Sequence, residues 1–251
     1  MLWVLNFKIE SWAAMAPGLE TREDWQHWLK HPENLPETLG KVSLEKIPPM
    51  LRRRFGVLGK CAMMAALQVL DENDSIPGIF SSRHGDTALT LSLLEDMGRD
   101  ELMSPTNFSL AVHNAVSGLF SIVRKDTSMV TSLAAMEGLV LHTLLEAAGQ
   151  LQVSDRVLCV IYDVPLPELY RRYCTGNDFP YAIAMILGRT GGVNYRVEQC
   201  EQVLQNNTSL LPASLSIDLE LVRFLELLTG ISTEMGVESN GAAWRISKIE
   251  S

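Results

Sequence analysis

The sequence predicts an α/β fold, a mostly parallel sheet flanked by helices. Short apolar runs typical of strands alternate along the chain with segments in which apolar residues recur at helical spacing. Residues 157–162 form a continuous apolar run, which is expected of a strand covered on both faces. Residues 128–138 indicate a short strand that turns abruptly into a helix. Together these features favour a sheet whose parallel strands are joined through helices.

The first part of the chain is predicted to hold two strands and three helices. Thr21 and Asp24 have capping-box-like spacing, which indicates that a short helix follows. Pro48 and Pro49 precede apolar residues at helical spacing, and proline is favoured in the first turn of a helix. In chain order, we expect a strand at 3–9, the short helix after Thr21, a long helix from Pro49 to Asp71, a strand at 78–82 and a helix at 87–97.

The middle of the chain continues this alternation. Ser104 and Pro105 combine the residues preferred at the N-cap and at the first helical position. Apolar residues from Phe108 to Phe120 then mark one face of a helix. The elements predicted here are a helix at 104–123, a strand at 128–133, a strongly apolar helix at 137–151 and a strand at 157–162.

After Asp163 the pattern of elements changes. Two strand-like segments, at 181–187 and 193–198, are joined through glycines and are expected to be neighbours. A helix is expected at about 215–228, and residues 242–249 alternate like an edge strand. This tail therefore has the elements of a second, shortened sheet.

Composition narrows the functional classes. The 251 residues carry 30 acidic and 21 basic side chains, a net charge of −9, which argues against nonspecific binding to nucleic acid. No apolar stretch is long enough to cross a bilayer and no signal-peptide pattern is visible, so a cytoplasmic protein is expected. The four cysteines show no metal-ligand pairing and no glycine-rich phosphate loop occurs, so neither a metal nor a cofactor is expected.

The turn after residue 133 has the form of a nucleophile elbow, the strand-to-helix turn that presents a reactive side chain in many α/β enzymes. Ala134, Ala135 and Met136 stand where a cysteine would be expected. A methyl group has neither a lone pair nor an acidic proton, so neither alanine can attack a thioester. The scaffold for covalent catalysis is therefore expected without its reactive atom.

Residues 104–163 resemble the N-terminal half of the β-ketoacyl synthases, which are condensing enzymes of the thiolase fold. Residues 49–55 and 81–86 are similar to a narrower group, the short ketosynthase-like chain-length factors found beside aryl polyene synthesis enzymes in Gram-negative bacteria. The resemblance is carried by Ser104-Pro105, by Val-His-Asn-Ala-Val-Ser-Gly-Leu-Phe-Ser-Ile at 112–122, by Ser128 and its strand, by the alanine elbow, by Gly138 and by the strand at 158–162.

This resemblance implies a thiolase-like fold in two regions. Residues 1–175 would correspond to the N-terminal half of a ketosynthase. Residues 176–251 would be a truncated second half, packed on the first as one compact unit.

Two departures from the family pattern bear on activity. The catalytic cysteine of the family aligns with Ala135, or with Ala134 if the gap is placed differently. Active members also carry two essential histidines in the C-terminal half, which polarise the carbonyl and promote decarboxylation. Without all three groups, the chain is expected not to perform the condensation itself. Its five histidines all precede residue 143: His27, His31, His84, His113 and His142.

The resemblance therefore implies a non-catalytic chain-length factor that pairs with an active β-ketoacyl-ACP synthase as a heterodimer. The strand at 128–133 would pair with the partner, the helix from Ser104 would line the acyl tunnel, and a basic run would contact the acyl carrier protein. The implied residues are Phe108, Val112, Ala115 and Val116 for the tunnel, Ser128, Met129, Val130, Thr131, Ser132 and Leu133 for the partner interface, and Arg52, Arg53 and Arg54 for the carrier protein.

Plainer interpretations stay open for each of these features. The elbow alanines and the tunnel residues can be core packing, and the arginines can form a solvated helix face. The loop at 83–86 (Arg-His-Gly-Asp) is most simply structural, with Gly85 supplying a positive φ. A purely structural, stabilising subunit is one alternative role.

The enzymatic alternative is a diverged acyltransferase or thioesterase with its own catalyst. None of the candidate cysteines stands at a strand-to-helix elbow, which argues against this role. The candidate residues are the thiols of Cys159, Cys174 and Cys200 and the imidazoles of His84, His113 and His142.

Overall fold

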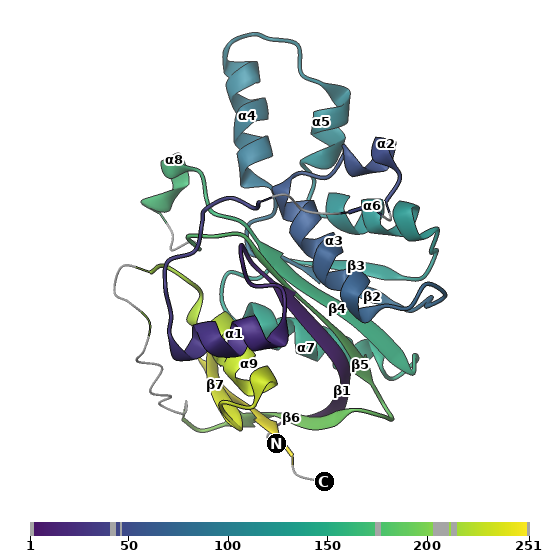
Figure 1. Ribbon diagram of the computed structural model, residues 1–251, viewed down its shortest axis with the longest axis vertical. Helices are drawn as coiled ribbons and strands as arrows, with labels where there is room; N and C mark the ends of the chain where they lie inside the picture. The colour runs from purple at the N-terminus through teal and green to yellow at the C-terminus, as the bar shows by residue number, and fades with distance from the viewer. Residues whose placement is uncertain are drawn as a thin grey trace.

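The computed structural model describes residues 3–40, 44–45, 47–173, 177–202, 211 and 215–249. The strands of this part of the chain form one eight-stranded sheet in the order β3-β2-β4-β5-β1-β6-β8-β7 (Figure 1). The strands are β1 (Val4–Met15), β2 (Gly78–Ser81), β3 (Val130–Leu133), β4 (Arg156–Asp163), β5 (Tyr181–Gly188), β6 (Val193–Cys200), β7 (Glu234–Ser239) and β8 (Ala242–Lys248).

The sheet is mixed, whereas the sequence predicted a mostly parallel one. Among the strand pairings of the described residues, only β2–β3 and β2–β4 are parallel; the others are antiparallel. The parallel prediction therefore holds for the β2, β3 and β4 region, where helices connect the strands. It fails beyond β4, because a continuous apolar run shows that a strand is buried on both faces but not in which direction it lies.

The expected second sheet is continuous with the first. Strands β5 and β6 do not pair with each other, as the glycine link between them suggested; they pair with opposite edges of β1. The link crosses the backbone of β1 at Ile9, and Gly192 has φ +84° there. A Cβ on Gly192 would collide with the carbonyl group of Ile9, so only glycine permits this crossing. The long strand β1 thus joins both regions of the chain.

The helices cover both faces of the sheet (Figure 1). Their apolar positions separate into two buried clusters. One cluster lies under α1, α7 and α9, and the other lies under α3 and α6. The helices are α1 (Arg22–Lys30), α2 (Pro49–Arg52), α3 (Val57–Val69), α4 (Thr87–Gly98), α5 (Pro105–Leu110), α6 (Ala115–Arg124), α7 (Leu139–Gln150), α8 (Glu168–Arg171) and α9 (Leu219–Thr229).

Two of the long predicted helices are interrupted. The helix predicted from Pro49 ends at Arg52 and resumes at Val57, with Gly56 as an extended N-cap residue. The helix predicted over 104–123 is divided into α5 and α6 at residues 111–114. Within this second break, Nε2 of His113 lies 2.9 Å from the carbonyl oxygen of Leu133. Apolar periodicity continues across both breaks, so it could not reveal them.

Several capping residues act as predicted. The side chains and backbones of Thr21 and Asp24 form a complete capping box at the start of α1. Ser104 accepts a hydrogen bond from the backbone N–H of Asn107 at the start of α5. Strand β7 and helix α8 were not predicted, and β1 extends to Met15 rather than ending at residue 9.

Among the described residues, no helix combines the length and apolar character needed to cross a membrane.

Candidate functional site

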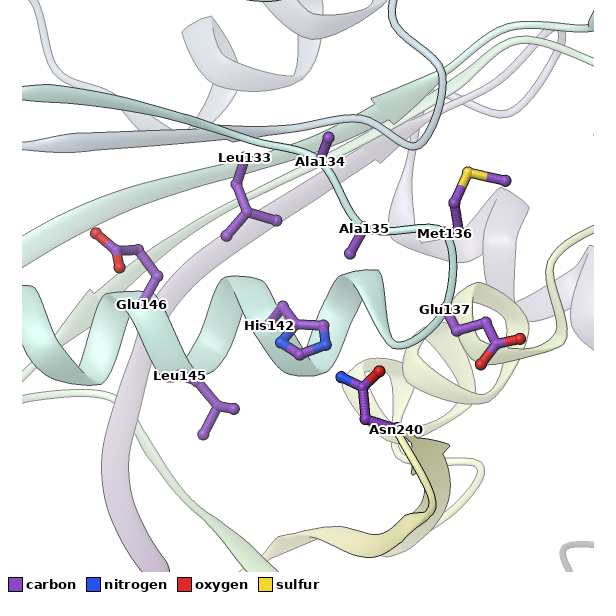
Figure 2. Close-up of a pocket in the computed structure, with 9 residues that line it drawn as sticks. All are labelled: Leu133, Ala134, Ala135, Met136, Glu137, His142, Leu145, Glu146 and Asn240. Carbon is purple, nitrogen blue, oxygen red and sulfur yellow. The ribbon is translucent and has the colours of Figure 1, made fainter.

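Strand β3 ends at Leu133 and helix α7 begins at Leu139, so residues 134–138 form the elbow (Figure 2). A cavity of about 760 Å³ lies beside it. Its lining combines residues 133–137 with three residues of α7 and with Asn240 from the turn between β7 and β8. Figure 2 shows Ala134 and Ala135 pointing to opposite sides of the backbone, with Ala135 on the side of His142. The side chain that the elbow presents toward His142 is therefore the methyl group of Ala135.

The elbow depends on Gly138, the N-cap residue of α7. Gly138 has φ +67° and ψ +34°, the left-handed conformation that favours glycine. A Cβ on Gly138 would lie 2.9 Å from the Cβ and Oγ of Ser239, at the end of β7. The same Ser239 Oγ lies 3.0 Å from Nε2 of His142, one turn into α7. The C-terminal region of the chain thus packs directly against the elbow.

The first turn of α7 is capped from a distant element. Gly138 has no side chain with which to cap the helix. Instead, the carboxylate of Glu220, in the first turn of α9, accepts a hydrogen bond of 3.0 Å from the backbone N–H of Leu141. Burial raises the pKa of Glu220 to about 7, although the backbone hydrogen bonds from α7 act in the opposite direction. Sequence reasoning missed this residue because no local pattern connects Glu220 with α7.

A buried polar network lies behind the elbow, at the ends of β2 and β4. The carboxylate of Asp163 accepts hydrogen bonds of 3.0 Å from the hydroxyl of Ser82 and from the backbone N–H of Arg83. Burial raises the pKa of Asp163 to about 6, and its hydrogen bonds and the Arg83 charge oppose that rise. The guanidinium of Arg83 lies 3.6 Å from the carboxylate of Asp218, next to α9.

The loop at 83–86 is bound into this network. The hydroxyl of Ser82 accepts a hydrogen bond of 2.9 Å from the backbone N–H of Gly85. Gly85 has φ +64°, the positive angle that the sequence predicted. Asp86 accepts a hydrogen bond from Leu89 N–H and so caps α4. Burial, followed by the Arg83 charge, lowers the pKa of His84. These contacts give the loop a structural role.

A second cavity contains three of the four predicted tunnel residues. It has a volume of about 430 Å³ and is lined by Val112, Ala115 and Val116, together with neighbouring apolar side chains such as Phe55 and Leu119. Phe108 lies outside this lining, with 59% of its surface exposed on α5. Phe55 joins the cavity through the break between α2 and α3, which the sequence did not predict.

Two of the three predicted carrier-protein residues also border this second cavity. Arg53 and Arg54 line it and are exposed, whereas Arg52 is half-buried and lies outside the lining. The structure therefore brings basic and apolar side chains from distant segments to one cavity.

The predicted interface strand lies at one edge of the sheet. Among the described strands, β3 is paired only with β2, so its other edge has no strand beside it. Residues Val130 to Leu133 are each half-buried, and Met129 before them is 52% exposed. Ser128 approaches Ser75, with the two hydroxyl oxygens 3.0 Å apart. The side chain of Ser132 is hydrogen-bonded to α6, and that of Thr131 is hydrogen-bonded to α7. These bonds hold β3 against the helices of its own chain.

The alternative catalysts are poorly placed for reaction. Cys61 and Cys159 are fully buried; burial raises the pKa of Cys61 to about 12 and raises that of Cys159 further. Cys200 is half-buried, and burial raises its pKa as well. Cys174 lies outside the described residues. Within the described part of the chain, no group of three or more His, Cys, Asp or Glu side chains is placed to hold a metal ion.

Comparison with known proteins settles the family. Residues 25–245 match the family model described as the N-terminal domain of β-ketoacyl synthase. The chain belongs to the β-ketoacyl synthase family. No curated protein matches it.

Solved structures agree with this family and with the thiolase-like ketosynthase fold. A chain from the complex of the ketosynthase ApeO with its chain-length factor ApeC, from Xenorhabdus doucetiae, superposes with a TM-score of 0.77 at 25% identity, over 97% of this chain and 99% of that one. A chain from the ishigamide ketosynthase/chain-length factor gives a TM-score of 0.70 at 11% identity, over 97% and 98% of the two chains. The resemblance to ketosynthase-like chain-length factors that the sequence indicated is confirmed.

A third similar chain comes from a complex that contains a carrier protein. It comes from AntDE:AntF, a type II polyketide synthase acyl-carrier protein in complex with its ketosynthase bound to the hexaketide. It superposes with a TM-score of 0.60 at 12% identity, over 98% of this chain and 100% of that one. At this identity the likeness concerns the fold alone.

Replacing Gly138 by alanine tests the elbow. Gly138→Ala should lower the free energy of unfolding by about 1–3 kcal/mol, because alanine is strained in the left-handed region and its Cβ would press on Ser239. Gly149→Ala, in the same helix and with open space around its Cβ, is the matched control and should be neutral or stabilising. Urea denaturation measures both; equal effects of the two substitutions would contradict this account.

The buried carboxyl groups predict a pH dependence of stability. A carboxyl whose pKa is raised in the folded protein stabilises the fold fully below its unfolded pKa, and this contribution is lost as the pH rises through the folded pKa. For Glu220 that window extends from about 4.5 to about 7. The unfolding free energy should therefore fall across this window, and less steeply in Glu220→Gln. Glu238→Gln, an exposed acid beside the same elbow, should keep the wild-type slope.

Proposed function

We propose that this chain is a non-catalytic chain-length factor. It pairs with an active β-ketoacyl-ACP synthase and forms part of the wall of the acyl tunnel at the heterodimer interface, in aryl polyene biosynthesis. The observation that carries the proposal is the alanine elbow: a ketosynthase-fold strand–turn–helix whose cavity is lined by Ala134 and Ala135. The likeness to a chain of the ApeO–ApeC complex supports the chain-length factor role.

The lack of catalysis follows from the chemistry of the elbow. Covalent condensation needs a nucleophile that can hold an acyl group, and neither alanine can supply one. His142 and His113, the imidazoles nearest the elbow, are engaged with Ser239 and with the carbonyl of Leu133. The reactive cysteine and its histidines are therefore assigned to the partner.

The edge of β3 supports pairing with the partner. An open strand edge favours the addition of another strand, and natural proteins usually cover such edges. Apolar side chains that flank β3 in sequence, and one on α6, which contacts β3, are also exposed to solvent: Met129 at 52%, Met136 at 51% and Ile122 at 54%. A partner strand beside β3 would complete the hydrogen bonding of the edge and cover these side chains.

The second cavity supports the tunnel-wall role. Val112, Ala115 and Val116 form an apolar part of its wall, and the exposed Arg53 and Arg54 line the same cavity. An alkyl chain gains about 0.8 kcal/mol for each CH₂ that it buries, until a bulky side chain blocks it. The two arginines at the same cavity suit the anionic phosphopantetheine or acidic surface of an acyl carrier protein. We assign Phe108 to the partner side of this wall, because it is exposed beside Val112.

Substituting Met129 tests the partner interface. Met129→Asp should weaken the complex with the partner ketosynthase by at least about tenfold, because an unpaired carboxylate buried in an interface costs more than about 1.4 kcal/mol. Val193→Asp, an exposed residue on β6 in the opposite half of the sheet, is the matched control. Co-expression followed by size-exclusion chromatography measures both. Equal co-elution of the two variants with the partner would count against this interface.

Substituting Val112 tests the tunnel. Val112→Phe should shift the products of the reconstituted pair toward shorter chains, because the larger ring fills the cavity. Leu102→Phe, at a fully exposed residue between α4 and α5, is the control and should leave the distribution unchanged. Mass spectrometry of carrier-bound products provides the readout. An unchanged distribution in Val112→Phe would favour the purely structural alternative.

A further inference from the structure

The N-terminal end of α7 is the helix end that faces the elbow. In an active elbow the nucleophile stands at such an end, where unpaired backbone N–H groups and the helix dipole favour a negative charge. In this chain an acidic group already lies there. The carboxylate of Glu220 accepts a hydrogen bond from Leu141 N–H, and the backbone N–H groups of Leu139 and Val140 also act on it.

Glu220 is held in this position by the fold. It lies in the first turn of α9, which packs against α7. Asp218, the N-cap residue of α9, accepts a hydrogen bond of 2.9 Å from the backbone N–H of Glu220 itself. Elbow residues Met136 to Gly138 line the same cavity of about 530 Å³ as Glu220. Ala135 lines the cavity of about 760 Å³ on the other side of these residues, where the ionisable neighbours are Glu137, His142 and Glu146.

The other charged groups around this cavity do not neutralise the charge of the Glu220 carboxylate. Arg83 lies 3.6 Å from Asp218, and its charge also acts on Asp163. Behind Arg83, Asp163 adds a second buried acid next to the ring of Tyr181. The remaining charged residues of the cavity lining are Glu137, Arg223 and Glu238. Acidic side chains outnumber basic ones, so the elbow end of α7 lies in a negative environment.

We propose that Glu220 is a second, independent obstacle to covalent chemistry in this chain: its carboxylate occupies the helix end that would otherwise stabilise a thiolate at position 135. Restoring a cysteine would therefore not restore a reactive thiolate. The inference rests on the proposed function, because it places the family's nucleophile at Ala135. Glu220 would thus have two roles: it holds the start of α7 by accepting a hydrogen bond from the helix backbone, and it keeps the elbow unreactive.

An introduced thiol tests the inference. Ala135→Cys is made in a background carrying Cys174→Ser and Cys200→Ser, and then combined with Glu220→Gln or, as the matched control, with Glu238→Gln. The rate of alkylation by iodoacetamide as a function of pH gives the pKa of the introduced thiol. Glu220→Gln should lower this pKa by about half a unit or more, since it removes a charge at the helix end but retains an acceptor for Leu141. Glu238→Gln should change it less.

The single substitution provides a second readout that does not depend on the folding of the Glu220 variant. With Glu220 in place, the introduced thiol should titrate at or above the ordinary cysteine value of about 8.5. A pKa well below 7 in Ala135→Cys alone would overturn the inference, as would equal pKa values in the Glu220→Gln and Glu238→Gln combinations. Neither result would affect the proposed function, which fails separately if the unmodified chain forms an acyl adduct.

Discussion

The contact between the first turn of α7 and the C-terminal elements is the constraint on which the rest of the structure depends. Gly138 turns the chain, Ser239 packs against it, and Glu220 caps the amides that follow. Only residues 134–138 separate β3 from α7. The same contacts therefore fix the position of the edge strand before the elbow and the shape of the cavity beside it. A region far along the chain therefore determines the geometry of the elbow, although it contributes no reactive group to it.

This arrangement suits the non-catalytic role that we propose for the chain. The elbow has a left-handed glycine at Gly138, and most of α7 behind it is buried. The features to which we assign a function lie on its outer sides: an edge of β3 that no described strand covers, and an apolar cavity lined by residues of α3 and α6 together with two arginines. Each of these is incomplete in the isolated chain, which is consistent with a subunit that acts through a partner.

Local sequence signals predicted the local structure well. The capping residues Thr21, Asp24 and Ser104, the positive φ of Gly85 and the strand–turn–helix at the elbow are all set by neighbours in sequence, and each is found. The resemblance to the β-ketoacyl synthase family added the fold, because the order of motifs is specific even where each one is weak. Of the predicted site residues, Val112, Ala115 and Val116 share a cavity, whereas Phe108 does not line it.

The features that sequence reasoning missed all arise from contacts between distant segments. The direction of β5 and β6 depends on the crossing of β1 at Gly192, and the cap of α7 comes from Glu220 on another helix. The measurement that tests the central claim most directly is intact mass spectrometry of the co-purified pair after exposure to an acyl thioester. The account predicts an acyl adduct on the ketosynthase partner and none on this chain. An adduct on this chain, retained when the partner's cysteine is replaced, would contradict it.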